Sequence, residues 1–189
     1  MIRHRTLASL TLAAAAGALL ALLAGSLTAA PVSPEVPRSV RLPSGRVVPI
    51  EAVTTGPDGR LDVPDDPRTA GWWSGGSRVG DPSGKTLLAA HIDAPRQGLG
   101  PYAELYAVRP GSRLVLRSAG LRQAFRVHSV RLLPRESLTA RPDLYSPNGA
   151  RRLVLITCAP PYDPGRGGYR NLVVLVAVPS GAPTPGTGR

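Results

Sequence analysis

The stretch RRLVLITCAPPYD, residues 151–163, holds the only cysteine of the chain where strand-forming residues give way to prolines. Alternation sorts its residues onto two faces: Val154, Ile156 and Cys158 on one, and Leu153, Leu155 and Thr157 on the other. Because Pro160 and Pro161 follow, we expect the strand to end there and the thiol to lie at a rim. Most free cysteines are small buried hydrophobes, but a rim thiol becomes a nucleophile where a cation or base lowers its pKa.

Five further apolar runs have the same strand-forming character. They are residues 46–53, 85–93, 112–120, 123–133 and 171–179, and turn residues such as Pro-Asp-Gly, Pro-Asn-Gly and Gly-Gly separate them. Helices are expected only as short segments, at residues 100–108 and 135–145. The pattern predicts a mainly β domain, either a barrel or a sandwich.

The first 34 residues are typical of a membrane-targeting segment. Arg3 and Arg5 precede an uncharged stretch, rich in Ala and Leu, that runs from Thr6 to Pro34. About 20 helical residues suffice to cross the hydrocarbon core of a bilayer. We therefore expect residues 1–34 to be a cytoplasmic stub and a signal anchor, which makes a single pass through the cytoplasmic membrane and leaves the rest extracellular. A signal peptide cleaved near Ala30 is the alternative.

Composition divides the exported part into three segments. Residues 35–43 are expected to form a Pro-rich spacer, residues 39–179 the folded domain, and residues 180–189 a disordered tail. With 42% hydrophobic residues, the chain can bury one core of ordinary size. A single cysteine in an exported domain cannot form an internal disulfide, so it is a partner for another chain or a reactive thiol.

The chain carries a net charge of +11, and Lys85 is its only lysine, so arginine supplies nearly all of the positive charge. Such a charge can mark a nucleic-acid binder. Here the arginines are scattered between apolar runs, and only 4% of residues are aromatic, which leaves few platforms for base stacking. We therefore expect no nucleic-acid partner, and some attraction to an anionic envelope or membrane.

The three histidines differ in their expected settings. His4 lies in the expected cytoplasmic stub. His128 lies within an expected strand, where we expect a partly exposed histidine with no catalytic role. His91 ends the run KTLLAA and opens a loop, a position from which it can meet another strand end. The Gly-rich turn GRGGYRN could bring Arg166 or Arg170 back over the end of the cysteine strand, although either could equally be a solvated loop charge.

Two stretches together resemble the sortases, membrane-anchored cysteine transpeptidases of Gram-positive bacteria. The first is TLLAAHIDAPRQGLGPYAEL (residues 86–105), and the second, after a β-rich interval, is LVLITCAPPYDPGRGGYRNLVVLVAV (residues 153–178). The segment GRLDVPDDPRTAGWW (residues 59–73) and the motif AHIDA (residues 90–94) are most similar to class F sortases, with class E second. The resemblance covers roughly residues 39–179 and implies a closed barrel of about eight strands with short connecting helices.

The resemblance assigns the family's cysteine to Cys158, its histidine to His91 and its arginine to Arg170, with Arg166 as the rival for the last role. Three departures from the family pattern leave these assignments in place but blur the subclass. They are Ala90 in place of the usual glycine, Ile156 at a position that is often threonine, and the Ala159-Pro160 pair after the cysteine.

These residue types imply a mechanism of acyl transfer. The Cys158 thiolate would attack the carbonyl of a Thr-Gly bond in a motif such as L-P-x-T-G and form a thioester. His91 would protonate the departing amine and then accept a proton from the incoming one, while Arg170 would bind the oxyanion or the substrate backbone. The implied partners are surface proteins that carry a sorting signal, an amine acceptor such as a cell-wall precursor, and the cytoplasmic membrane.

Other classes fit the pattern less well. An L,D-transpeptidase has its histidine just before its cysteine, and a papain-like protease has its cysteine first in the chain. The non-enzymatic alternative is a membrane-tethered β-barrel binding module with a structural cysteine. No cofactor is expected, since no His, Cys or carboxylate spacing indicates zinc, and Asp62, Asp65 and Asp66 alone do not predict a calcium site.

Overall fold

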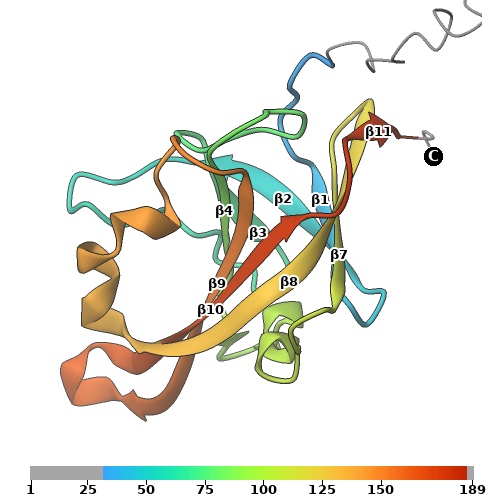
Figure 1. The fold of residues 1–189 in the computed structure, drawn as a ribbon. Helices are drawn as coiled ribbons and strands as arrows, with labels where there is room; N and C mark the ends of the chain where they lie inside the picture. Colours follow the sequence, from blue (N-terminus) through green and yellow to red (C-terminus); the bar gives the residue numbers. More distant parts are fainter. Residues whose placement is uncertain (1–31, 187–189) are drawn as a thin grey trace, which may run out of the picture. The chain divides into compact units, whose positions relative to one another are not determined.

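Within residues 32–186, the part of the chain described by this computed structural model, eight strands close into a barrel (Figure 1). They are β1 (Ser39–Arg41), β2 (Val47–Val53), β3 (Ala70–Trp73), β4 (Lys85–Ala89), β7 (Arg113–Arg117), β8 (Leu121–Pro134), β9 (Arg152–Asp163) and β10 (Gly168–Pro179). Their order is β10-β9-β4-β3-β2-β1-β7-β8, and the pairing of β8 with β10 closes the ring. The β2–β3 and β4–β9 pairs are parallel and the others antiparallel. The predicted mainly β barrel is confirmed.

Short elements connect or extend these strands. The 3-10 helices between residues 32 and 186 are η2 (Pro101–Tyr106), η3 (Arg135–Ala140), η4 (Pro142–Leu144) and η5 (Pro164–Arg166). β5 (Asp93–Ala94) pairs with β6 (Gly98–Leu99) in a small hairpin, and β11 (Thr184–Pro185) pairs with β8. The two helical segments expected from the sequence are therefore present, as 3-10 rather than α-helical turns.

β9 and β10 are buried on both faces, which explains their unbroken apolar runs. Leu153 and Leu155 of β9 point into the barrel core, while Val154 and Ile156 belong to a second apolar cluster outside the barrel. The predicted alternation along residues 153–158 is thus confirmed. Cys158 packs against the outer cluster, so the thiol lies on the outer face of the barrel.

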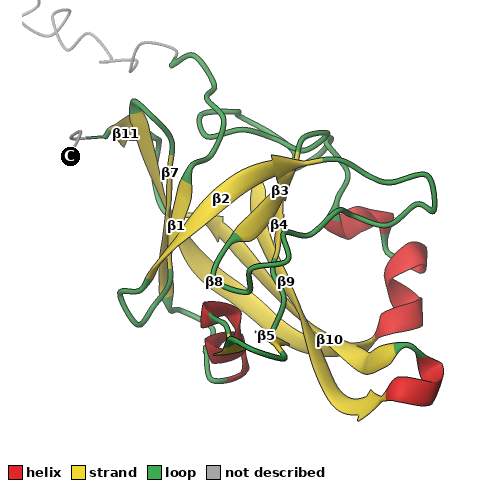
Figure 2. Cartoon of the chain, turned by 180° about the vertical axis from the view of Figure 1, so that it is seen from behind, coloured by secondary structure: helices red, strands yellow, loops and turns green. Residues whose placement is uncertain are grey.

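The loop between β8 and β9 covers this outer face. Leu138, Leu144 and Tyr145 of the loop pack on the outer cluster. Figure 2 shows η3, η4 and η5 gathered on one side of the barrel, with η2 apart from them at the lower end. The loop is fastened to the start of β4, where Gly84 N donates to Gly149 O at 2.7 Å and Lys85 Nζ donates to Asn148 O at 2.7 Å.

The expected end of the cysteine strand at Pro160 is wrong, because β9 continues to Asp163. β4 ends at Ala89, so beyond Thr157 the strand β9 pairs only with β10. Within the described part of the chain, the edge of β9 that faces away from β10 has no neighbouring strand there. A proline whose ring nitrogen lies on that edge removes no hydrogen bond between strands, because no acceptor is present. A register shift in β10 between Tyr169 and Asn171 accommodates the two prolines.

Two terminal segments are more ordered than their composition indicates. Residues 35–43, expected to be a spacer, include β1, and Val40 and Leu42 are fully buried in the barrel core. In the expected tail, Thr184 pairs with Arg122 of β8. A backbone ladder and a few buried side chains outweigh the Pro-rich and Gly-rich composition.

The expected signal anchor, residues 1–34, lies almost wholly outside the described residues. Within residues 32–186, no helix has both the length and the hydropathy needed to cross a bilayer. Anchoring in the membrane stays a prediction from the sequence.

Substitutions on β8 and β9 test which side chains point into the barrel core. Leu155→Ala removes a fully buried side chain from the barrel core and is expected to lower the free energy of unfolding by about 2–5 kcal/mol. Leu132→Ala on β8 is the matched control, because Leu132 is 57% exposed, and it should change the stability by less than about 0.5 kcal/mol. Urea titration followed by tryptophan fluorescence measures both, and equal losses would contradict this assignment of faces.

Candidate active site

The parallel pair β4–β9 brings the predicted histidine to the predicted cysteine. Ala89 pairs with Ile156, and Ala90 N donates to Ile156 O at 3.2 Å. The buried hydroxyl of Thr157 donates to Ala90 O at 2.8 Å, which continues the same register past the end of β4. His91 and Cys158 are the next residues along the two segments, so we expect their side chains to lie near each other.

Alternation then settles the face on which the two side chains lie. Ala90 and Thr157 are buried, and Ala90 belongs to the barrel core, so the next residues on both strands point outward. His91 and Cys158 are both half-buried on this outer face. Leu172 of β10 pairs with Cys158 from the other side and belongs to the outer apolar cluster. Cys158 and Leu172 therefore form a row on adjacent strands, and His91 follows the end of β4 on the other side of Cys158.

Three influences act on the Cys158 thiol. Burial raises its pKa above the ordinary value, the Arg135 guanidinium lowers it, and the Asp93 carboxylate raises it. Burial is the largest of the three, so their net effect raises the pKa of the thiol above its ordinary value. Arg135 begins η3 and donates from Nη1 to Gly167 O at 3.0 Å, which ties the covering loop to the β9–β10 turn.

A hydrogen bond between a phenol and a carboxylate lies close to the Cys158 thiol. Tyr169 of β10 donates from its hydroxyl to Asp93 Oδ2 at 2.6 Å, and this bond raises the pKa of Tyr169 to about 12. Within residues 32–186 no arginine or lysine forms an ion pair with Asp93. No local pattern in the sequence points to Asp93, Tyr169 or Arg135, because their closeness to the thiol comes from the packing of β5, β10 and η3.

The two candidate arginines occupy different positions. Arg170 precedes Asn171 on β10, and its Nη2 donates to Glu136 Oε1 of η3, so its side chain lies on the covered outer face. Its Nη1 also approaches Arg166 O at 3.5 Å. Arg166 lies in η5, and its side chain is 71% exposed beside Asp163. Of the two, Arg170 is the more buried, with its side chain 28% exposed, and it lies two residues before Leu172 on β10.

The remaining candidates lie elsewhere. His128 is exposed on β8, as expected, and His4 lies outside the described residues. In the part of the chain from residue 32 to residue 186, no group of three or more His, Cys, Asp and Glu side chains could hold a metal ion.

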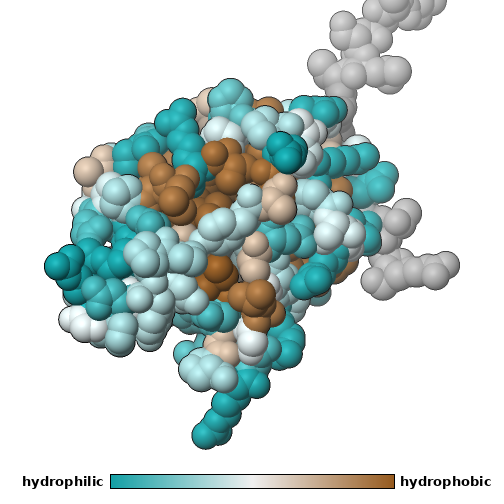
Figure 3. Space-filling model, turned by 90° about the horizontal axis from the view of Figure 1, so that it is seen from below, coloured by the Kyte–Doolittle hydropathy of each residue, from teal (hydrophilic) through white to brown (hydrophobic). Residues whose placement is uncertain are grey.

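The barrel end at which β4 and β9 stop presents an apolar surface. Leu99, Tyr106 and Tyr162 are exposed there, on the loops that follow β4 and on the β9–β10 hairpin. Figure 3 views the molecule from this side and shows brown hydrophobic areas enclosed by teal hydrophilic surface. Apolar side chains beside a thiol favour contact with an apolar peptide or protein.

Comparisons with known proteins agree with this geometry. The family model of the sortase domain matches residues 45–179. The fold is similar to a pilus-related sortase C of Group B Streptococcus, with a TM-score of 0.56, 19% identity, and coverage of 79% of this chain and 69% of that one. For the SrtA sortase of Actinomyces oris these values are 0.57, 18%, 82% and 84%.

A sortase A of Listeria monocytogenes is similar as well, with a TM-score of 0.58, 17% identity, and coverage of 82% of this chain and 92% of that one. A search of curated proteins found no match. The family model covers well over half of the chain, and the non-enzymatic alternative is thereby set aside. The chain belongs to the sortase family and is a cysteine transpeptidase.

Proposed function

We propose that Cys158 is the nucleophile and His91 its proton-transfer partner in the transfer of an acyl group from a sorting-signal peptide to an amine. The observation that supports the proposal is the β4–β9 register, in which Ala89 pairs with Ile156 and Thr157 bonds to Ala90, so that His91 and Cys158 are the next residues on the two segments. A thiol and an imidazole on adjacent strands are the nucleophile–base pair that such chemistry requires.

Because burial raises the pKa of the Cys158 thiol, the first step requires a base that removes its proton. Proton transfer from Cys158 to His91 yields a thiolate and an imidazolium. The sulfur then bonds to the scissile carbonyl carbon, the C–N bond breaks, and the imidazolium gives its proton to the departing amine. In the second half the nitrogen of the incoming amine bonds to the thioester carbon, His91 accepts the proton of that amine, and the C–S bond breaks to release the Cys158 thiolate, which then takes the proton back from His91. Water in place of the amine gives hydrolysis.

Arg170 serves the carbonyl oxygen in this scheme. A guanidinium has five N–H donors, and the contacts with Glu136 and Arg166 leave others for a substrate oxygen. Glu136 holds the planar group on the covered outer face beside the thiol row. A permanently charged donor in this position stabilises the negative oxygen of the tetrahedral intermediate.

The substrate motif, the location and the subclass complete the proposal. The acyl donor carries an L-P-x-T-G-like motif that is cut between Thr and Gly, and the acceptor is an amine such as that of a cell-wall precursor. Residues 1–34 anchor the protein in the cytoplasmic membrane, with the domain of residues 39–179 on the extracellular side. The stretch at residues 59–73 and the motif AHIDA favour class F over class E.

Removal of the thiol tests the nucleophile. Cys158→Ala should abolish both the acyl-enzyme and the turnover of motif peptides, because the chain has no second cysteine. His91→Ala should lower kcat/KM by about 10²–10⁴-fold, the range of a general acid-base group, and still permit alkylation of the thiol. Incubation with motif peptides and an amine, followed by mass spectrometry of products and protein, measures both, and an active Cys158→Ala protein would refute the mechanism.

The two arginines can be separated by substitution. Arg170→Lys keeps the charge but loses the planar fork, and kcat/KM should fall by about 10²-fold or more if the guanidinium binds the oxyanion. Arg166→Ala is the matched control, since its side chain is exposed at the hairpin tip, and it should retain most activity. Loss of activity in Arg166→Ala with full activity in Arg170→Ala would reverse the assignment.

The rate of Cys158 alkylation by iodoacetamide, measured across pH, tests the charges around the thiol. The carboxylate of Asp93 raises the thiol pKa, so Asp93→Asn should shift the alkylation profile to lower pH. Arg135 lowers the same pKa, so Arg135→Ala should shift the profile to higher pH. Arg113→Ala, on the distant strand β7, should leave it in place. Shifts of the opposite sign would show that these side chains do not act on the thiol through their charge.

A further inference from the structure

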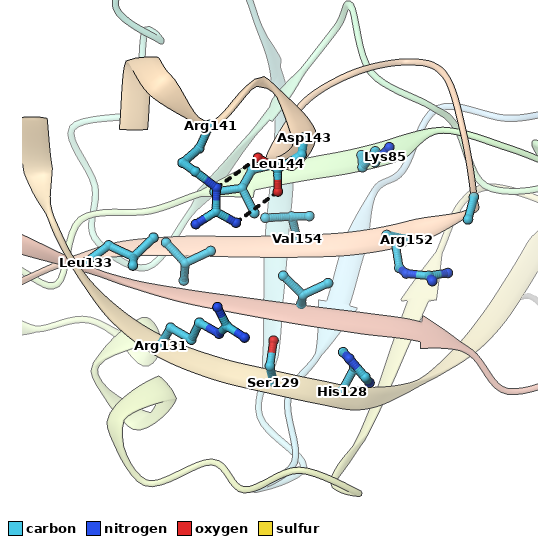
Figure 4. A pocket seen from close by; sticks show the side chains of 13 residues that line it. Lys85, His128, Ser129, Arg131, Leu133, Arg141, Asp143, Leu144, Arg152 and Val154 are labelled. Carbon is cyan, nitrogen blue, oxygen red and sulfur yellow. Dashed lines mark hydrogen bonds and ion pairs between the residues drawn. The ribbon is translucent and has the colours of Figure 1, made fainter. Parts of the chain in front are cut away.

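The outer face of the barrel carries a pocket in line with the thiol, beyond Ile156. It has a volume of about 300 Å³ and lies under the β8–β9 loop (Figure 4). Its floor consists of Val154, Val174 and Val176, and basic side chains at its edge are Lys85, Arg131 and Arg152. None of the three basic residues takes part in the chemistry proposed above.

Strand register arranges this face in rows parallel to the row of the thiol. Cys158 and Leu172 form the first row, Ile156, Val174 and Arg131 the second, and Val154, Val176 and Ser129 the third. Lys85 pairs with Arg152 two residues further along β9, which makes a fourth row. Leu133 of β8 pairs with Leu172 and lines the pocket, so the pocket reaches the row of the thiol on the β8 side.

The length of this surface matches a short extended peptide. Val154 is four residues from Cys158, a distance of about 13 Å at a rise of about 3.3 Å per residue. The acyl part of the donor contains four residues of the motif, L-P-x-T. If this part is extended and its threonine carbonyl lies at Cys158, the residue that directly precedes the motif lies level with Val154. That residue therefore lies between the row of Arg131 and the row of Arg152.

The acyl part of the donor belongs on this side of the thiol. The β8–β9 loop covers the outer face here and makes a lined cleft, whereas beyond Cys158 the hairpin of β9 and β10 is exposed at Tyr162. Binding energy from residues of the donor away from the scissile bond can lower the barrier at the reacting carbonyl, so we expect the enzyme to bind several residues of the acyl donor. The covered cleft is the part of the surface with room for them.

Charge indicates what the pocket selects. The one carboxylate in its lining, Asp143, is already bound by Arg141 through hydrogen bonds of 2.8 and 2.9 Å. Among residues 32–186, no carboxylate forms an ion pair with Arg131 or Arg152. In Figure 4, Arg131 lies on the wall opposite Arg141, and Arg152 and Lys85 lie at the end away from Leu133. Uncompensated guanidinium groups around an apolar floor favour a carboxylate.

We propose that this pocket binds an acidic side chain of the acyl donor, at the residue directly preceding the sorting motif. The inference rests on the proposed function, because it takes the donor's threonine carbonyl to lie at Cys158. It adds a selection by charge, outside the motif, through Arg131 and Arg152.

Three peptides that differ only in the residue before the motif test the proposal. With Glu, Gln or Lys at that position, kcat/KM of the full chain for transfer to a simple amine should fall in that order. The ratio between the Glu and Lys peptides should be about three- to ten-fold at low salt, and smaller at high salt because ions screen the pair.

Charge reversal identifies the pocket as the cause. Arg131 is exposed on β8, and Arg131→Glu should reverse the order of the Glu and Lys peptides, while Arg152→Gln should reduce the preference. Arg113→Glu is the matched control, since it changes the net charge equally from the exposed start of β7 and should keep the order. An unchanged rate of Cys158 alkylation in each variant confirms that the site has folded.

The outcomes separate the two proposals. Equal kcat/KM values for the three peptides, or a preference that neither pocket variant alters, would overturn the acidic subsite and leave the transpeptidase chemistry intact. If the wild-type chain alkylates at Cys158 but turns over none of the peptides, the proposed motif cleavage falls, and the subsite falls with it.

Discussion

The parallel pairing of β4 with β9 is the constraint on which the site depends. It joins segments more than sixty residues apart in the chain, and its register decides whether His91 meets Cys158. A slip of one residue would turn the cysteine toward the core, since side chains alternate between faces. The buried hydroxyl of Thr157 bonds to the carbonyl of Ala90 and maintains this register past the last strand residue of β4, where the ladder alone ends.

β9 and β10, the strands that carry Cys158 and Leu172, are buried on both faces. The barrel core holds the inner side chains, and the β8–β9 loop packs on the outer ones, so the strands are rigid where the thiol emerges. The loop is fastened at both ends: at Lys85 by the bond to Asn148, and at Gly167 by the bond from Arg135. The same contacts that stabilise the barrel thus shape the cleft and bring a cation to the thiol.

The sequence predicts six strands because each carries a run of strand-forming apolar residues bounded by turn residues, but it does not reveal their pairing. β1, β3, β5, β6 and β11 have two to four residues each, too few for a periodic signal, and their partners are distant in the chain. The continuation of β9 past Pro160 depends on a free strand edge that only the fold creates. Cys158, His91 and Arg170 are predicted through a family resemblance, whereas the effect of Asp93, Arg135 and Tyr169 on the thiol depends on how β5, η3 and β10 pack together, which the sequence pattern does not reveal.

Electrostatics give the outer face a direction. Although the chain is strongly basic, with a net charge of +11, carboxylates lie near the thiol: Asp93 is bound to Tyr169 and Glu136 to Arg170. Four residues away, at the pocket, arginines exceed carboxylates. In the proposed binding mode, an acidic residue before the motif is attracted to the arginines of the pocket, and the amine acceptor, while it is still an ammonium ion, is attracted to Asp93. The order of charge along β9 therefore favours the orientation in which the donor's carbonyl reaches the sulfur and the amine arrives from the side of His91.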